Sequence, residues 1–284
     1  MPVFEGQGVE LYYEEKGNGQ PVVFVHGTIC DFRAWSSQVE ALSQGFRTIT
    51  YSRRYAHPND RKGDVMDSTV QNNSADLEAL IAGLGLERVH LVGHSQGGFI
   101  ATYFAIQHPQ LLRSLTLVNA AVSTLLVRDN STATALKLLL TSPRLAISGR
   151  MTVSGAKAAI RAIDAGDRSA AERIFVPALE NRRKGLPAKP AGFSEMVADN
   201  AATLKETTTP PPQVTALQTT TIKAPTLVVW GELSAPWDAR VSELLSKSIP
   251  ESEAGRIAGA GHFCLVEKPA EVNECMKAFI LKHA

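Results

Sequence analysis

A serine between two glycines, at the end of a short apolar run, places the strongest constraint on how this chain folds. Residues 89–92 are mainly apolar, and the five residues from Gly93 to Gly97 read Gly-His-Ser-Gln-Gly. Residues 97–107 then have the composition of a buried helix. This order of strand, Gly-x-Ser-x-Gly and helix predicts a sharp turn that lifts the hydroxyl of Ser95 out of a sheet. Because glycine lacks a Cβ, Gly93 and Gly97 let the two elements approach closely.

The composition fits one large α/β domain or a domain with an insertion. The chain has 284 residues, of which 44% are hydrophobic, and a net charge of +1. Without a long block of like charge, a nucleic-acid partner is not expected. No apolar run approaches the roughly 20 residues of a membrane helix, and no signal peptide is visible, so we expect no membrane partner and a cytoplasmic location. Cys30, Cys264 and Cys275 lack metal-ligand spacing and predict reduced thiols and no metal site.

Apolar runs alternate with helix-like segments over most of the chain. The predicted strands cover residues 9–15, 22–25, 47–51, 89–92, 115–118, 225–230 and 253–257. Helical spacing of apolar residues predicts helices over 35–42, 68–84, 97–107, 239–248 and 271–282. Strands that alternate with helices indicate a doubly wound, mostly parallel sheet.

The alternation stops between residues 123 and 213. This stretch is rich in Ala, Leu, Arg and Thr, and its helix-like pieces at 133–140, 156–165 and 169–178 are interrupted by prolines. We therefore interpret residues 123–213 as a helical cap, inserted into a core domain made of residues 1–122 and 214–284.

Three motifs in this order resemble those of the α/β-hydrolase superfamily. Besides the motif around Ser95, His26-Gly27 follows a buried strand and resembles the oxyanion-loop motif of that family. The segment from Gly259 to Phe263 resembles its catalytic-histidine loop. The resemblance implies an eight-stranded sheet with a helical cap, or lid, inserted after the sixth strand.

The resemblance also assigns roles in an enzyme that needs no cofactor. Ser95 is the expected nucleophile, and His262 is the expected general base, because a neutral hydroxyl attacks poorly until a base removes its proton. The backbone N–H groups of Thr28 and Gln96 are expected to form the oxyanion hole.

The third member of a serine–histidine–acid triad is missing from its usual places. Family members commonly carry an aspartate three residues after the glycine that ends the seventh strand, and this chain has Ser234 there. A minority carry the acid after the sixth strand, where this chain has Asn119. Asn119 is the preferred candidate, because its carbonyl oxygen can orient His262 as an asparagine does in some cysteine proteases.

The alternatives to Asn119 stay open at this point. Ser234 offers a weaker hydrogen bond. Asp238 belongs to Pro-Trp-Asp, which is equally typical of a helix start where the carboxylate caps the helix. Glu232 and Asp129 are further candidates.

Residues 53–57, Arg-Arg-Tyr-Ala-His, follow the fourth strand, where the family often has an aspartate and a glycine-rich turn. Arg53, Arg54 and His57 can either bind an anionic substrate group or brace the loop through salt bridges. The second interpretation is preferred.

The leading hypothesis is a serine hydrolase that cleaves an ester, a thioester, a lactone or an activated C–C bond in a small to medium apolar substrate. A cofactor-independent lyase on the same fold is the first alternative, since the absent acid weakens the base. A ligand sensor with a decayed triad is the second. The sequence does not distinguish a monomer from a dimer.

Overall fold

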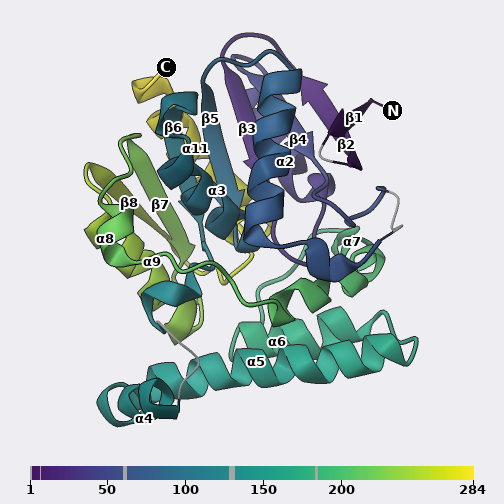
Figure 1. Cartoon of the computed structure of the whole chain (residues 1–284), viewed down its shortest axis with the longest axis vertical. Helices are drawn as coiled ribbons and strands as arrows, with labels where there is room; N and C mark the ends of the chain where they lie inside the picture. Colours follow the sequence, from purple (N-terminus) through teal and green to yellow (C-terminus); the bar gives the residue numbers. More distant parts are fainter. Residues whose placement is uncertain (1, 7, 60–62, 128–131, 183–184) are drawn as a thin grey trace.

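An eight-stranded sheet forms the centre of the protein (Figure 1). The computed structural model describes residues 2–6, 8–59, 63–127, 132–182 and 185–284. The strands are β1 (Val3–Gly6), β2 (Val9–Lys16), β3 (Pro21–Val25), β4 (Arg47–Tyr51), β5 (Val89–His94), β6 (Leu112–Val118), β7 (Thr226–Gly231) and β8 (Ser252–Ile257). Their order is β1-β2-β4-β3-β5-β6-β7-β8. Strand β2 pairs antiparallel with β1 and β4, and the remaining pairs are parallel, which confirms the predicted doubly wound, mostly parallel sheet.

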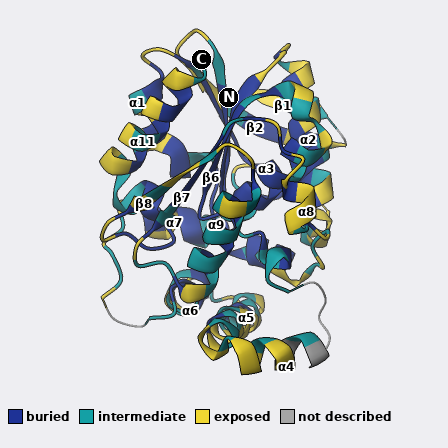
Figure 2. Cartoon of the chain, turned by 90° about the vertical axis from the view of Figure 1, so that its left-hand side faces the viewer, coloured by how far each residue is buried: buried dark blue, intermediate teal, exposed yellow. Residues whose placement is uncertain are grey.

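Helices cover both faces of the sheet, as the view along the sheet shows (Figure 2). Helices α1 (Ser36–Leu42) and α11 (Pro269–Lys282) pack on one face, and α2 (Val70–Gly83), α3 (Gln96–Gln107) and α9 (Pro236–Ser248) on the other. The central strand β3 is apolar from Val22 to Val25 because both of its faces are covered. In β3, successive side chains alternate between the two cores: Val22 and Phe24 contribute to one, Val23 and Val25 to the other.

The described part of residues 123–213 contains helices and turns but no strand. Its elements are η4 (Ser123–Leu125), α4 (Thr132–Thr141), α5 (Pro143–Asp164), the π-helical turn η5 (Ala171–Phe175), α6 (Val176–Leu179), α7 (Phe193–Asp199) and the 3-10 helix η6 (Ala201–Thr208). We call residues 123–213 the helical segment. It lies below the sheet in Figure 1.

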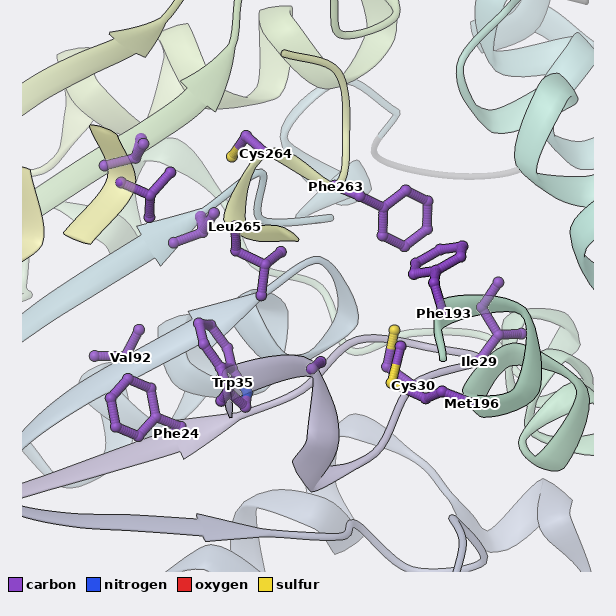
Figure 3. Packing of buried hydrophobic residues seen from close by; sticks show 14 of the residues in the cluster. Phe24, Ile29, Cys30, Trp35, Val92, Phe193, Met196, Phe263, Cys264 and Leu265 are labelled. Atoms are coloured by element: carbon purple, nitrogen blue, oxygen red, sulfur yellow. The ribbon is translucent and has the colours of Figure 1, made fainter. Parts of the chain in front are cut away.

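The helical segment shares a hydrophobic core with the sheet. Phe193 and Met196 of α7 belong to the same buried cluster as Trp35, Phe24 and Phe263 (Figure 3). The rings of Phe193 and Phe263 meet edge to face at 5.2 Å between centroids. The segment is therefore packed tightly against the sheet, and its status as a separate cap domain stays a prediction.

Helix α5 is longer than the predicted helix over 156–165, because it begins at Pro143, a residue expected to interrupt the helices. Pro143 occupies the first turn of α5, where a missing N–H costs no hydrogen bond. Gly149 is required by contact with another helix: a Cβ there would come within 2.7 Å of the Trp237 ring.

The remaining short elements are η1 (Phe32–Trp35), η2 (Val65–Asp67), η3 (Pro109–Leu111), α8 (Ala216–Thr219) and α10 (Cys264–Glu267). Among the described residues, no helix combines the length and the apolar character needed to cross a bilayer. The cytoplasmic location stays a prediction.

Candidate active site

The candidate site lies where parallel strands end. Ser95 follows β5, His262 follows β8, Asp238 lies in the first turn of α9 after β7, and Thr28 follows β3. Because these strands are parallel, their carboxyl ends share one edge of the sheet, which is where ligands bind in folds of this kind. This edge faces the helical segment (Figure 1).

Ser95 adopts the strained turn that the sequence predicts. Its φ of 53° and ψ of −119° lie outside the regions that residues with a Cβ favour. The backbone around it is tightly held: Ser95 N–H donates to the Val118 carbonyl at 3.0 Å, and its own carbonyl accepts from Ala121 N–H at 2.9 Å. Gly97 is required, since a Cβ would lie 2.1 Å from the Val25 carbonyl oxygen. Strain of this kind persists only where neighbours enforce it, and it is typical of functional sites.

Ser95, His262 and Asp238 form a continuous line of hydrogen bonds. His262 Nε2 lies 2.9 Å from Ser95 Oγ, and His262 Nδ1 lies 2.8 Å from Asp238 Oδ2. Because a carboxylate only accepts hydrogen bonds, the proton of the neutral imidazole is assigned to Nδ1. Nε2 is then free to accept the hydroxyl proton of Ser95, so this arrangement can deprotonate the serine.

The surroundings of His262 strengthen it as a base. Its side chain is almost fully buried, and burial alone would lower its pKa. The Asp238 carboxylate opposes this, helped by Glu180 and Glu267, so that the pKa of His262 is raised above its ordinary value. A raised pKa means that His262 binds a proton more firmly once it has taken one from Ser95.

The position of Asn119 corrects the expectation that it orients His262. Its Nδ2 donates to Ser234 Oγ at 2.8 Å, and its Oδ1 accepts from Gly231 N–H at 3.1 Å. These bonds tie the end of β6 to the turn after β7, while the histidine hydrogen bond goes to Asp238 instead. Asn119 also has a positive φ of 43°, which Asn tolerates better than most residues.

The other candidates for the third member are accounted for as follows. Ser234 accepts from Asn119, and Glu232 accepts from Gly259 N–H at 3.2 Å. Asp129 lies outside the described residues. Asp238 does not cap its helix: the N-cap residue of α9 is Ala235, and no side chain makes a capping hydrogen bond there. The carboxylate of Asp238 is therefore directed to His262, four residues later in the chain than the usual family position at Ser234.

The structure brings Thr28 and Gln96 next to the serine. Gln96 follows Ser95 directly, and the loop that carries Thr28 touches it: a Cβ on Gly27 would lie 2.9 Å from Ser95 Cβ. The Thr28 hydroxyl donates to Glu206 at 2.6 Å, so this side chain is held by a partner in the helical segment. The backbone N–H groups are the parts of both residues that remain suited to binding an oxyanion.

Arg53 and Arg54 are each paired with a carboxylate. Arg53, which is 2% exposed, binds both oxygens of Glu206 at 3.1 and 2.8 Å. Arg54 binds both oxygens of Asp76 at 2.7 Å. Arg53 also braces the oxyanion loop, because its Nε donates to the His26 carbonyl and its backbone N–H to His26 Nε2. The structure thus favours loop bracing over anion binding.

The helical segment contacts three of the loops that carry the site. Ser148 Oγ accepts from Trp237 N–H at 3.1 Å, next to Asp238. Glu180 Oε1 accepts from the backbone N–H of His262 at 2.9 Å. With the Glu206 contact to Thr28, each of these loops has a hydrogen-bond partner in the segment. Single-sequence reasoning missed these residues, since no local pattern distinguishes them.

His94 is held neutral beside the site. Its Nε2 donates to the His262 carbonyl at 3.0 Å, and burial lowers its pKa to about 3. A neutral His94 avoids a second positive charge next to an imidazolium at His262. It therefore supports the histidine loop.

The chain is similar to several enzymes of known or assigned function. A cis-3-alkyl-4-alkyloxetan-2-one decarboxylase of Shewanella oneidensis is 26% identical over 96% of this chain and 86% of its own. A non-heme chloroperoxidase of Kitasatospora aureofaciens is 34% identical, but over only 44% of this chain and 45% of its own. A carbamate hydrolase homologue of Azorhizobium caulinodans also matches over less than half of its length, 44%, at 31% identity.

Solved structures share the fold. An esterase of Exiguobacterium antarcticum superposes with a TM-score of 0.75 at 20% identity, with 96% of each chain covered. The enol-lactonase of Burkholderia xenovorans gives a TM-score of 0.64 at 20% identity, over 99% of this chain and 100% of its own. The family described as alpha/beta hydrolase fold matches residues 20–269. The chain therefore belongs to the alpha/beta hydrolase family.

Proposed function

We propose that this protein is a serine hydrolase that cleaves carboxylic esters, thioesters or lactones with Ser95, His262 and Asp238 as its triad. The observation that carries the proposal is the hydrogen-bonded line from Ser95 Oγ through His262 to Asp238. It joins a nucleophile, a base and an acid from three different strand ends in the order that acyl transfer requires.

The reaction follows from this order. Ser95 Oγ attacks the substrate carbonyl carbon while His262 Nε2 takes the hydroxyl proton. The negative charge that forms on the carbonyl oxygen is stabilised by the N–H groups of Thr28 and Gln96. His262 then gives its proton to the leaving alcohol or thiol, which leaves an acyl group on Ser95. A water molecule, deprotonated by His262, releases the acid and restores the serine.

Asp238 has two tasks in this scheme. It keeps the Nδ1 tautomer of His262, and it stabilises the imidazolium that forms during both transfers. The lyase and the decayed ligand sensor were considered because His262 lacked an acid partner in the sequence. Asp238 supplies that partner, so this reason no longer favours either alternative. Lactones belong in the substrate class because a relative that aligns over most of this chain is named for an oxetan-2-one, a four-membered lactone.

Covalent labelling tests the proposal. Incubation with a fluorophosphonate should add one phosphonyl group at Ser95, seen by intact mass and located by peptide mapping. Ser95→Ala should take up no label and should hydrolyse none of a panel of p-nitrophenyl esters, acyl thioesters and β-, γ- and δ-lactones. The exposed Ser154 provides the matched control, since Ser154→Ala should label and turn over like the natural protein. An unlabelled natural protein that is inactive on the whole panel would contradict the proposal.

A further inference from the structure

The helical segment presents an unusual concentration of exposed apolar side chains on two neighbouring helices. Six of the ten large apolar residues that are exposed in the described part of the chain lie between residues 136 and 153. They are Leu136, Leu139, Leu140, Ile147, Met151 and Val153, with exposures from 39% to 75%. Helices α4 and α5 contact each other and project at the end of the molecule farthest from both termini (Figures 1 and 2).

The spacing shows that these residues form faces. Leu136, Leu139 and Leu140 are separated by three and four positions, so they share one side of α4. Ile147 and Met151 are separated by four and share one side of α5. On an ordinary surface helix this spacing marks the buried face, and here it is exposed to solvent.

The charge of the same helices is almost entirely positive, since their one acidic residue is Asp164 at the end of α5, which pairs with Lys205. Residues 132–163 contain five cations, Lys137, Arg144, Arg150, Lys157 and Arg161, and no Asp or Glu, whereas the whole chain is nearly balanced at 29 to 28. All five are exposed. These cations lie next to the apolar residues on the helix surface, since Lys137 is three positions before Leu140 and Arg144 is three positions before Ile147. An ion-pair partner for these cations is absent from the described residues.

We propose that the exposed face of α4 and α5 docks onto an anionic lipid bilayer. Amphipathic helices that carry Lys and Arg beside Leu, Ile and Met lie in the plane of a membrane interface, with the apolar side chains among the acyl chains and the cations at the headgroups. The apolar side chains of this face would contact the acyl chains, and its cations would contact the acidic headgroups. This proposal differs from the expectation, drawn from the sequence, that no membrane takes part.

Two other occupants fit less well. In a two-fold dimer the same patch meets itself, which would bring ten cations together without an acidic residue from either copy of this face. A nucleic acid would satisfy the cations but would leave the three leucines of α4 exposed. A bilayer with acidic headgroups satisfies both kinds of side chain.

Vesicle co-sedimentation of the full chain tests this proposal independently of catalysis. The protein should pellet with vesicles of equal parts phosphatidylglycerol and phosphatidylcholine, and not with phosphatidylcholine alone. Added salt should release it, because the screening length shortens. Replacing Leu136, Leu139 and Leu140 by Asp should abolish pelleting. Replacing Arg150, Lys157 and Arg161 by Gln should weaken binding by about fivefold for each cation removed.

Matched variants elsewhere on the surface distinguish binding through this face from non-specific adsorption to the vesicles. Leu281 has the same 57% exposure as Leu136, and Leu217 is 78% exposed, so Leu217→Asp with Leu281→Asp serves as the apolar control. Lys223, Lys247 and Lys277 are exposed cations for the charge control. Both controls should pellet like the natural protein. Failure to bind the anionic vesicles would overturn the proposal, as would a dimer, seen by sedimentation equilibrium, that the α4 variant disrupts.

Discussion

Ser95 and the loops that surround it are held in different ways. The hydrogen bonds of the Ser95 backbone go to Val118 and Ala121, so the sheet and its immediate connections fix the nucleophile. The oxyanion loop and the histidine loop depend in addition on Glu206 and Glu180 of the helical segment. The difference indicates that the segment completes the site as well as covering it. Variants on each side of this division should therefore behave differently.

The largest effect is expected at Asp238, whose carboxylate lies 2.8 Å from His262 Nδ1. Asp238→Asn should lower kcat by roughly 10⁴-fold, the loss seen when the same change is made in another serine triad. The amide cannot stabilise the imidazolium and favours the wrong tautomer of His262. Steady-state hydrolysis of an ester found in the labelling panel measures the effect. A loss of less than tenfold, in a variant that melts like the natural protein, would show that Asp238 is not the third member.

Glu206→Gln should damage both stability and catalysis. It leaves Arg53 buried without its charge partner, which costs roughly 3 kcal/mol or more in the free energy of unfolding. It also loosens the loop of Thr28, so kcat should fall in the protein that remains folded. Urea unfolding and active-site titration separate the two effects.

Asp76→Asn is the matched control for Glu206→Gln. Asp76 pairs with Arg54 through two hydrogen bonds of the same kind, but on α2 and away from the oxyanion loop. It should destabilise the fold and leave kcat per active site nearly unchanged. Equal losses of kcat in both variants would contradict the claim that the helical segment, through Glu206, positions the oxyanion loop.

Glu180→Gln should change the pH dependence more than the rate. The variant keeps an oxygen that can accept from His262 N–H but removes a negative charge that raises the pKa of His262. Glu267, its partner Lys189 and Asp238 remain around the ring. Since His262 must be neutral to act, the acid limb of kcat/KM should move to lower pH. An unmoved acid limb would mean that Glu180 acts only as a hydrogen-bond acceptor.

The smallest effect is expected at Asn119. Asn119→Asp should not raise turnover, because His262 already has its carboxylate. It should cost about 1 kcal/mol of stability, since an ionised Asp cannot donate to Ser234. A rise in kcat would restore Asn119 as a candidate for orienting His262.

The sequence predicted those parts of the site that depend on local geometry. Ser95 lies in a turn that its own glycines permit, and the family motif identifies His262 and the Thr28 loop. Asp238 was kept as an alternative but not chosen, because the motif position holds Ser234 and the carboxylate comes from the following helix turn. Only the packing of α9 against the histidine loop shows where that side chain is directed.

Contacts from the helical segment could not be predicted in the same way. Glu206 pairs with Arg53 across 153 positions and Glu180 with His262 across 82. Such pairs depend on how the segment packs onto the sheet, and no periodicity in one sequence encodes that. The absence of strands from the described part of residues 123–213 was easier to predict, since it requires only that the alternation of strands and helices stops.

The central claim is that Ser95, His262 and Asp238 act as one unit, and a double variant tests it most directly. Residual ester hydrolysis should be measured for Ser95→Ala, for Asp238→Asn and for the two combined. Without the nucleophile, the carboxylate has nothing left to support, so the double variant should be as slow as Ser95→Ala alone. A double variant slower than Ser95→Ala by the full factor of Asp238→Asn would show that the two residues act independently and would contradict the account.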